Sequence, residues 1–331
     1  MTDTPRIRTA RLKKHFGTVL AVDGVDLHVG EGQIFGFLGP NGSGKTTTIR
    51  MLTTLLRPTA GSIEIDGLDA LTHASEVRRR IGVALQEAGL DDMQTGRELL
   101  TLQAHLCEVP GREVARRVND LLEVVELADA ADRRIKTYSG GMQRRLDLAS
   151  ALIHGPRIIF LDEPTTGLDP ASRDSLWRYV DRLNREEGVT FFLTTQYLEE
   201  ADALAHEVAI IDRGRIVAQG TPTALKASVG ADVVTIGLHA DVARSDALHA
   251  AVAALPNVEE VRDVDDTLVV YVRDGAAAIA PIVLAMREVG VDVRDVSLKE
   301  PTLDDVFLRK TGHHLEPDAA AEEQEAAGAG A

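Results

Sequence analysis

The hydrophobic and polar positions of this chain change period several times, and the period predicts which elements form. Short apolar or alternating runs predict β-strands over 7–16, 22–29, 34–38, 62–66 and 81–85. A continuous apolar run at 158–161 is typical of a parallel strand buried on both faces, and 190–195 predicts the strand after it. Helical spacing separates these runs, so the alternation of strands and helices predicts an α/β core.

A helical segment interrupts this alternation between about 95 and 155. Leu99, Leu102 and Leu106 recur at helical spacing, and Pro110-Gly111 ends that run. A second amphipathic helix follows, with its apolar face at Val114, Val118, Leu121, Leu122 and Val125. The pattern therefore predicts a helical lobe inserted into the α/β core.

The composition shifts again near 231, where a smaller set of strands and helices begins. Its order is strand, helix, two strands, helix and strand, at 233–238, 246–255, 258–261, 268–272, 276–289 and 291–298. That βαββαβ order predicts a small ferredoxin-like α+β domain. We therefore divide the chain into a core domain at 5–230, an accessory domain at 231–312 and an acidic, Ala-rich tail at 313–331. The tail lacks large apolar residues beyond Pro317, so it is expected to be disordered.

The charge and the composition of the chain disfavour some classes of function. The 331 residues include 36 Lys and Arg against 52 Asp and Glu, a formal net charge of −16. Nucleic-acid-binding surfaces are normally basic, so DNA and RNA are disfavoured as the main partner. A single cysteine, Cys107, excludes an intrachain disulfide. No apolar run approaches the about 20 residues that span a bilayer, so another chain is expected to supply any membrane span.

The strongest chemical signal is a glycine-rich stretch between a predicted strand and a predicted helix. It reads GPNGSGKTT and fits the phosphate-binding P-loop pattern G-x-x-x-x-G-K-[ST]. The glycines let successive backbone N–H groups turn inward at a helix N-terminus, where they bind an anion. Lys45 adds a point charge for the outer phosphates, and the Thr46 hydroxyl is placed to ligate Mg²⁺. The candidate nucleotide-binding residues are Gly39, Pro40, Asn41, Gly42, Ser43, Gly44, Lys45, Thr46 and Thr47.

Three further candidates lie near other predicted strands. Asp162 and Glu163 follow the apolar run 158–161, and ligand chemistry in open α/β sheets sits at the carboxyl ends of strands. Asp162 suits a Mg²⁺-holding role, and Glu163 suits the activation of a water molecule. Phe16 lies shortly upstream of the P-loop strand, where it either stacks on an adenine ring or serves as a core residue of an edge strand.

A second glycine-rich helix start occurs at Ser139-Gly140-Gly141. Ser139 is a good N-cap, and the free N–H groups of a helix start suit an anion. Taken alone, this stretch is a weak signal and is better explained as an ordinary helix cap.

Together these motifs resemble the ATP-binding subunit of an ATP-binding-cassette (ABC) transporter over roughly 5–230. GPNGSGKTT resembles the Walker A loop, and IIFLDEP resembles Walker B with the catalytic glutamate at Glu163. Ser139-Gly140-Gly141-Met142-Gln143 resembles the signature motif, and Gly167-Leu168-Asp169 resembles the D-loop. Gln86 is similar to the family's Q-loop glutamine, which senses Mg²⁺ and the transmembrane partner. The resemblance implies a P-loop NTPase core.

One position departs from the family pattern. TTQYLEEAD resembles the switch region, which usually carries histidine where this chain has Gln196. This glutamine, the stretch Thr95-Gly96-Arg97-Glu98 and the C-terminal TLDDVFLRKTG resemble antibiotic-resistance exporters of the daunorubicin/doxorubicin type.

The resemblance implies an ATPase that powers drug export through a separate membrane permease. It implies ATP and Mg²⁺ as cofactors, with Lys45, Glu163 and Gln196 in catalysis. Thr46, Gln86 and Asp162 would surround the metal. It also implies a second copy of the chain, packed head to tail, with the complex peripheral to the cytoplasmic face of the cell membrane. For the C-terminal domain it implies a role in assembly or regulation.

Two alternatives remain open at the level of sequence. A soluble ABC-type ATPase acting on ribosomes or DNA commonly has two cassettes or a long coiled-coil insertion, and the sequence shows neither. A nucleotide-binding regulator that hydrolyses ATP poorly is the other alternative, because Gln196 cannot perform the proton chemistry of histidine. Release of phosphate by the purified chain separates a regulator from an ATPase.

Overall fold

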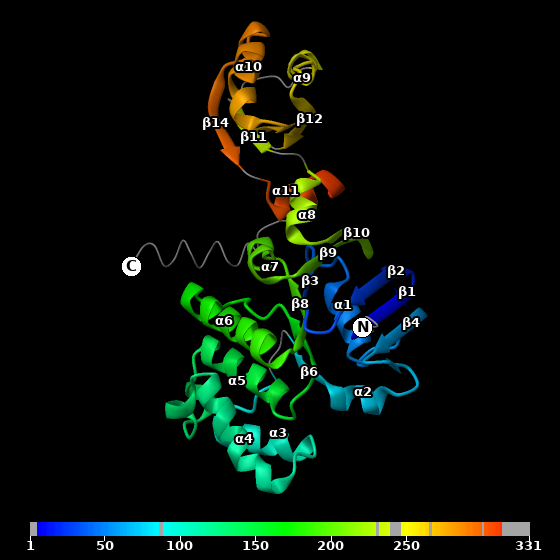
Figure 1. Ribbon diagram of the computed structural model, residues 1–331, viewed down its shortest axis with the longest axis vertical. Helices are drawn as coiled ribbons and strands as arrows, with labels where there is room; N and C mark the ends of the chain where they lie inside the picture. Colours follow the sequence, from blue (N-terminus) through cyan, green and yellow to red (C-terminus); the bar gives the residue numbers. More distant parts are fainter. Residues whose placement is uncertain are drawn as a thin grey trace. The chain divides into compact units, whose positions relative to one another are not determined.

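The computed structural model describes residues 5–85, 89–229, 232–238, 246–264, 267–299 and 301–312. The chain divides into two compact units, the first ending at Gln219 and the second beginning at Gly220 (Figure 1). Gln86 and the tail at 313–331 lie outside the described residues. Within the described ranges, no helix is both long and apolar enough to cross a membrane.

The central sheet of the first unit has the strand order β10-β9-β3-β8-β7-β6. These strands are β3 (Ile34–Leu38), β6 (Ile81–Ala84), β7 (Ile158–Asp162), β8 (Thr190–Thr195), β9 (Glu207–Asp212) and β10 (Arg215–Gly220). All but β10 pair in parallel, so their carboxyl ends meet at one edge of the sheet. Every residue of β3, β7 and β8 is buried, as expected for strands covered on both faces.

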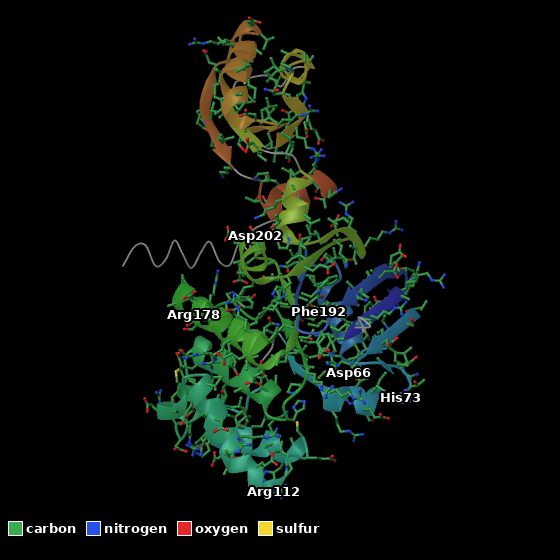
Figure 2. All side chains as sticks on the ribbon, viewed as in Figure 1. Asp66, His73, Arg112, Arg178, Phe192 and Asp202 are labelled. Atoms are coloured by element: carbon green, nitrogen blue, oxygen red, sulfur yellow. The ribbon has the colours of Figure 1, made fainter. Side chains whose placement is uncertain are left out.

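Alternate residues of these strands face two separate hydrophobic cores. The first core joins the central sheet to an antiparallel sheet and two helices: β1 (Ile7–Phe16), β2 (Val19–Val29), β4 (Ala60–Ile65), β5 (Leu68–Asp69), α1 (Lys45–Leu52) and α2 (Ala74–Arg80). Phe192, which Figure 2 labels, lies in this core. Its ring centroid is 5.5 Å from that of Phe35, 5.5 Å from that of Phe37 and 5.7 Å from that of Phe160. Aromatic packing therefore holds three neighbouring parallel strands together.

The second core extends from the other side of the central sheet into a helical lobe. Its helices are α3 (Gly96–Leu106), α4 (Gly111–Val124), α5 (Gly140–Leu152) and α6 (Pro170–Glu187). Figure 1 shows α3, α4 and α5 gathered together beyond β6. Thr95 and Glu98 form a capping box that fixes the start of α3. The predicted α/β core with an inserted helical lobe is thus confirmed.

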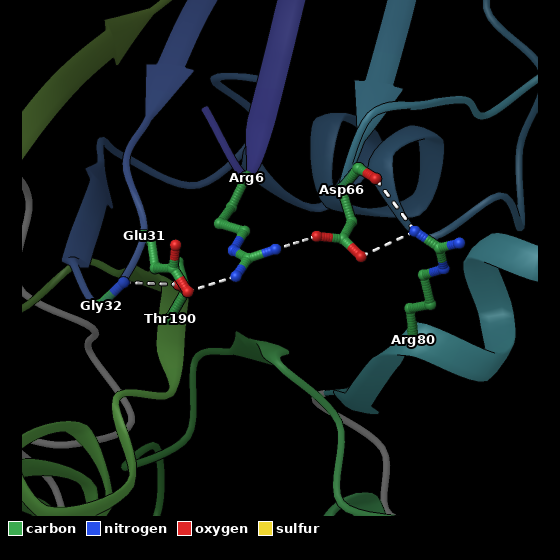
Figure 3. A network of polar contacts seen from close by, with 6 residues as sticks. All are labelled: Arg6, Glu31, Gly32, Asp66, Arg80 and Thr190. Carbon is green, nitrogen blue, oxygen red and sulfur yellow. Dashed lines mark hydrogen bonds and ion pairs between the residues drawn. The ribbon is translucent and has the colours of Figure 1, made fainter. Parts of the chain in front are cut away.

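A network of ion pairs and hydrogen bonds ties the two sheets together at the edge where the parallel strands of the central sheet begin. It comprises Arg6, Glu31, Gly32, Asp66, Arg80 and Thr190 (Figure 3). Arg6, just before β1, forms ion pairs with both Glu31 and Asp66. Arg80 donates to the Asp66 carboxylate at 2.8 Å and to its main-chain oxygen at 3.0 Å. These contacts fix the end of the fold opposite the carboxyl edge of the central sheet.

The second unit is an antiparallel sheet in the order β12-β13-β11-β14 with helices on it. Its elements are α8 (Pro222–Ala227), β11 (Asp232–Leu238), α9 (Asp246–Ala253), β12 (Val258–Val264), β13 (Thr267–Val272), α10 (Gly275–Glu288), β14 (Val293–Lys299) and α11 (Leu303–Thr311). The chain order and the strand order are those of a ferredoxin-like fold, as predicted. The unit begins before the expected boundary at 230, because α8 packs against α11.

Candidate functional site

The P-loop occupies the carboxyl edge of the central sheet, directly between β3 and α1. β3 lies between β8 and β9, and Leu38 at its end pairs with Thr195 at the end of β8. Asp162 at the end of β7 pairs with Thr194. The segments that follow β3, β7 and β8 therefore meet at the same edge, which is where ligands bind in open α/β sheets.

Two glycines of the loop occupy positions that exclude a side chain. A Cβ atom on Gly39 would lie 2.2 Å from the main-chain oxygen of Ile211. Gly44, the N-cap of α1, has φ of 111°, and a Cβ atom there would lie 2.7 Å from the Ala21 oxygen of β2. The loop therefore needs glycine for both space and backbone conformation, and β2 lies close beside it.

Lys45 and Glu163 form a buried ion pair beside this loop. Lys45 is 4% exposed and Glu163 is 7% exposed. Lys45 Nζ lies 3.2 Å from Glu163 Oε1 and donates to the main-chain oxygens of Gly39 and Pro40 at 2.7 and 3.2 Å. The fold thus brings together the cation expected at the outer phosphates and the carboxylate expected to activate water.

The backbone of Glu163 has a conformation that non-glycine residues rarely adopt. Its φ is 46°, in the left-handed region, which costs roughly 1–2 kcal/mol for a residue with a side chain. The Glu163 N–H donates to the main-chain oxygen of Thr194 at 3.1 Å and to its hydroxyl at 3.0 Å. The same hydroxyl donates to Asp162 Oδ1 at 2.6 Å. Thr194 therefore holds both adjacent carboxylate residues in place, and strain at this turn is typical of functional sites.

An unpartnered polar atom supports the fit of a phosphate group. Ser43 is 3% exposed, and its Oγ atom has no hydrogen-bond partner among the described residues. A phosphate oxygen would satisfy this hydroxyl. The half-buried Thr46 hydroxyl at the start of α1 and the Asp162 carboxylate are oxygen donors of the kind Mg²⁺ takes together with phosphate oxygens and water. The residues present fit ATP with Mg²⁺, and their individual roles remain predictions.

The second glycine-rich helix start lies in the helical lobe. Ser139 caps α5, because its hydroxyl accepts from the Met142 N–H at 3.3 Å. Ser139 and Gly140 are exposed, whereas Gly141 packs against Ser172 at the start of α6. This exposed helix start belongs to α5 in the helical lobe, whereas the buried Lys45 begins α1 beside the P-loop.

The remaining candidates from the sequence are Phe16, Gln196 and Gln86. Phe16 is 49% exposed at the end of β1, with Lys14 Nζ 5.1 Å from its ring centroid, so it is not a core residue. Gln196 is half-buried and directly follows β8 at the carboxyl edge. Gln86 lies outside the described residues, although Leu85 before it directly follows β6, whose carboxyl end lies at the same edge. The roles of all three stay predictions.

Sequence reasoning missed three side chains that support the site: Thr194, Arg144 and Glu200. Glu200, on α7 (Leu198–Leu204), accepts hydrogen bonds from the hydroxyls of Thr165 at 2.9 Å and Thr195 at 3.3 Å, and burial raises the pKa of its carboxyl. Arg144 on α5 donates to main-chain oxygens at the ends of β6 and β7. A charged residue between apolar positions of a helix is a signal for Arg144, but its partners depend on tertiary structure.

Family models match both units of the chain. The model described as ABC transporter matches residues 22–166. The model described as the C-terminal domain of ATP-binding proteins DrrA1-3 matches residues 220–311. The two matches follow the order of the α/β core and the ferredoxin-like unit.

Known relatives match nearly the whole chain. The daunorubicin resistance ATP-binding protein DrrA3 of Streptomyces coeruleorubidus is 46% identical over 94% of this chain and 97% of that protein. The daunorubicin/doxorubicin resistance ATP-binding protein DrrA of Streptomyces peucetius is 43% identical over 98% of each chain. The Nod factor export ATP-binding protein I of Paraburkholderia xenovorans is 40% identical over 92% of this chain and 97% of that protein.

Solved structures agree with these sequence relatives. A dimeric ATP-binding cassette in a post-hydrolysis state, bound to ADP and Pi, is 26% identical with a TM-score of 0.60. It covers 65% of this chain, and the match takes in 98% of that structure. The chain therefore belongs to the ABC transporter family as an ATP-binding subunit with ATPase activity, in the group of the daunorubicin and doxorubicin resistance proteins.

Proposed function

We propose that this chain hydrolyses ATP to energise the export of a drug or antibiotic of the daunorubicin/doxorubicin type through a separate membrane permease. The observation that carries the proposal is the buried contact of 3.2 Å between Lys45 and Glu163 at the carboxyl edge of the sheet. It supports hydrolysis of a nucleotide held on the P-loop. The named relatives, which match nearly end to end, support the assignment to drug export.

The side chains at this edge divide the chemistry between them. Backbone N–H groups of the P-loop and the Lys45 ammonium bind the phosphates, and Phe16 stacks on the adenine ring. Thr46, Gln86 and Asp162 would hold Mg²⁺. Bound Mg²⁺ supplies positive charge to the phosphate oxygens. Glu163 orients the attacking water and accepts its proton. Its contact with Lys45 supports this role, because it puts the carboxylate next to the group that binds the outer phosphates.

The site needs partners that the chain alone does not supply. Each chain offers one P-loop and one exposed helix start at Ser139, and two chains packed head to tail place Ser139 to Gly141 of one against the nucleotide of the other. The relative solved as a dimer with ADP and Pi supports such a pair. We place the complex on the cytoplasmic face of the cell membrane, bound to an integral-membrane permease, with no nucleic acid. We assign the domain at 231–312 to assembly or regulation, and 313–331 to a dispensable tail.

ATP-dependent uptake of daunorubicin into inverted membrane vesicles tests the export function. The vesicles should contain this chain and the integral-membrane protein encoded beside its gene. Glu163→Gln in the same vesicles should reduce uptake at least about tenfold, since general-base loss alone typically costs more than that in rate. Uptake that persists in vesicles without this chain would contradict the proposal. ATPase activity that cofractionates with ribosomes instead of membranes would favour the alternative of a soluble ABC-type ATPase.

Gln196→Ala is expected to slow phosphate release by about 10–100-fold, because it removes an amide donor to the γ-phosphate, a charged acceptor. Gln196→His should retain substantial activity, since an imidazole N–H can donate at the same place. Steady-state phosphate release measures both. Gln219→Ala in β10 is the matched control, because it removes a glutamine bonded to Glu207 at 3.0 Å. Equal rates for Gln196→Ala and Gln219→Ala would refute this role.

A further inference from the structure

Arg144 connects the helical lobe to the backbone on both sides of Glu163. It lies on α5, five positions after the Ser139 cap, and is only 9% exposed. Arg144 Nη2 donates to the main-chain oxygen of Asp162 at 2.9 Å, and Nε donates to that of Pro164 at 3.0 Å. The guanidinium is thus hydrogen-bonded to the main-chain oxygens of the residues immediately before and after Glu163.

The same guanidinium also reaches the end of a second strand, β6, and a carboxylate of its own helix. Arg144 Nη1 donates to the main-chain oxygen of Leu85 at 2.5 Å, directly before Gln86 in the chain. It also donates to Asp147 Oδ2, one turn along α5, at 3.2 Å. Burial lowers the pKa of the Arg144 guanidinium and raises the pKa of the Asp147 carboxyl to about 6. A planar guanidinium with several fixed donors suits such a junction, whereas a lysine ammonium is a single point charge.

We propose that Arg144 is a positioning residue that holds Glu163 in its reactive place and couples it to the helix start at Ser139. This inference rests on the proposed role of Glu163 in hydrolysis. Glu163 sits in a strained turn with φ of 46°, so its carboxylate stays beside Lys45 only while the flanking backbone is restrained. Arg144 supplies that restraint from α5, the helix that begins at the exposed Ser139.

The coupling follows from the rigidity of the connected parts. Engagement of Ser139 by the nucleotide of a second copy moves α5 as a rigid helix. Arg144 transmits that movement to three main-chain oxygens at the carboxyl ends of β6 and β7, those of Leu85, Asp162 and Pro164. The catalytic carboxylate and the segment leading into Gln86 therefore respond together to the docking of the partner copy.

Arg144→Gln is expected to lower kcat about 100-fold while KM for Mg-ATP changes no more than about threefold, because small misplacements of a reacting group carry costs of that size. Arg145→Gln is the matched control. Arg145 is the neighbouring residue on α5, but it donates to Val125 and Glu126 within the lobe, at 3.0 and 3.3 Å. Its turnover should stay within about twofold of the wild-type chain. The assay is steady-state phosphate release by the full-length chain, with melting temperature and binding of fluorescent ATP measured in parallel.

A double variant separates positioning from general destabilisation. If Arg144 acts through Glu163, then Arg144→Gln should cause no further loss in a Glu163→Gln background, measured as residual single-turnover hydrolysis. Should Arg144→Gln fail to fold, Arg144→Lys serves instead, with an expected loss of about tenfold that also vanishes in the Glu163→Gln background. An undiminished loss in that background overturns the proposal, and so does turnover equal to that of Arg145→Gln. Full activity of Glu163→Gln itself would instead refute the proposed role of Glu163.

Discussion

Glu163→Gln is expected to reduce steady-state ATP hydrolysis by about 10²–10⁴-fold, the usual contribution of a general base. The amide is nearly isosteric with the carboxylate, so the strained turn at Glu163 and its hydrogen bonds to Thr194 should persist. Lys45 retains the main-chain oxygens of Gly39 and Pro40 as partners. Removing a negative charge beside the γ-phosphate should leave ATP binding unchanged or tighter. Two measurements on the same preparation test this prediction: the rate of phosphate release and the equilibrium Kd for ATP.

Glu199→Gln is the control for this variant, because it removes one carboxylate from an exposed position of α7. Its turnover should match the wild-type chain. If Glu163→Gln hydrolyses ATP as fast as Glu199→Gln, another group activates the water. If the wild-type protein binds Mg-ATP but never releases phosphate, the result would instead favour the alternative of a nucleotide-binding regulator that hydrolyses ATP poorly.

The fold was largely predictable because local signals agree with the tertiary structure. The continuous apolar runs of β7 and β8 are buried on both faces, and Asp169 with Pro170 marks the start of α6, as their side-chain chemistry predicts. The order βαββαβ was sufficient for the ferredoxin-like unit. The start of that unit was not predictable, because α8 belongs to it only through packing against α11, far along the chain.

The candidate site likewise has parts that could be predicted from the sequence and parts that could not. The P-loop, Asp162 and Glu163 could be located because each has a motif next to a strand end. The contact between Lys45 and Glu163, by contrast, depends on the pairing of β3 with β8 and of β7 with β8. The partners of Arg144 could not be predicted for a related reason: they are main-chain oxygens, which have no signature in the sequence. Side chains that bind backbone groups are found only once the strands are placed.

ATP is expected to convert Glu163→Gln chains from monomers into dimers in solution. A nucleotide that binds the closed pair about 100 times more tightly than the separate chains strengthens association by up to about 100-fold. Two nucleotides per pair, one at each P-loop, therefore strengthen it by up to about 10⁴-fold. Slow hydrolysis in this variant lets the pair accumulate, and light scattering coupled to size exclusion gives its mass with and without Mg-ATP.

A substitution in the helix start at Ser139 tests whether this part of the chain takes part in dimerisation. Gly140 is exposed, and a side chain there would meet no atom within 4 Å, so Gly140→Glu should leave the monomer folded. A carboxylate in the first turn of α5 even stabilises the helix itself, by about 0.3–1 kcal/mol, through the helix dipole. In the pair, however, it would face the triphosphate of the other chain and repel it.

Gly111→Glu is the control for this variant. Gly111 lies in the first turn of α4, and a side chain there would also meet no atom within 4 Å, so the Gly111→Glu variant should still dimerise. Dimerisation of the Gly140→Glu variant with ATP, or a strictly monomeric Glu163→Gln chain at high concentration with permease present, would exclude a nucleotide shared between Lys45 and the Ser139 helix of a second copy.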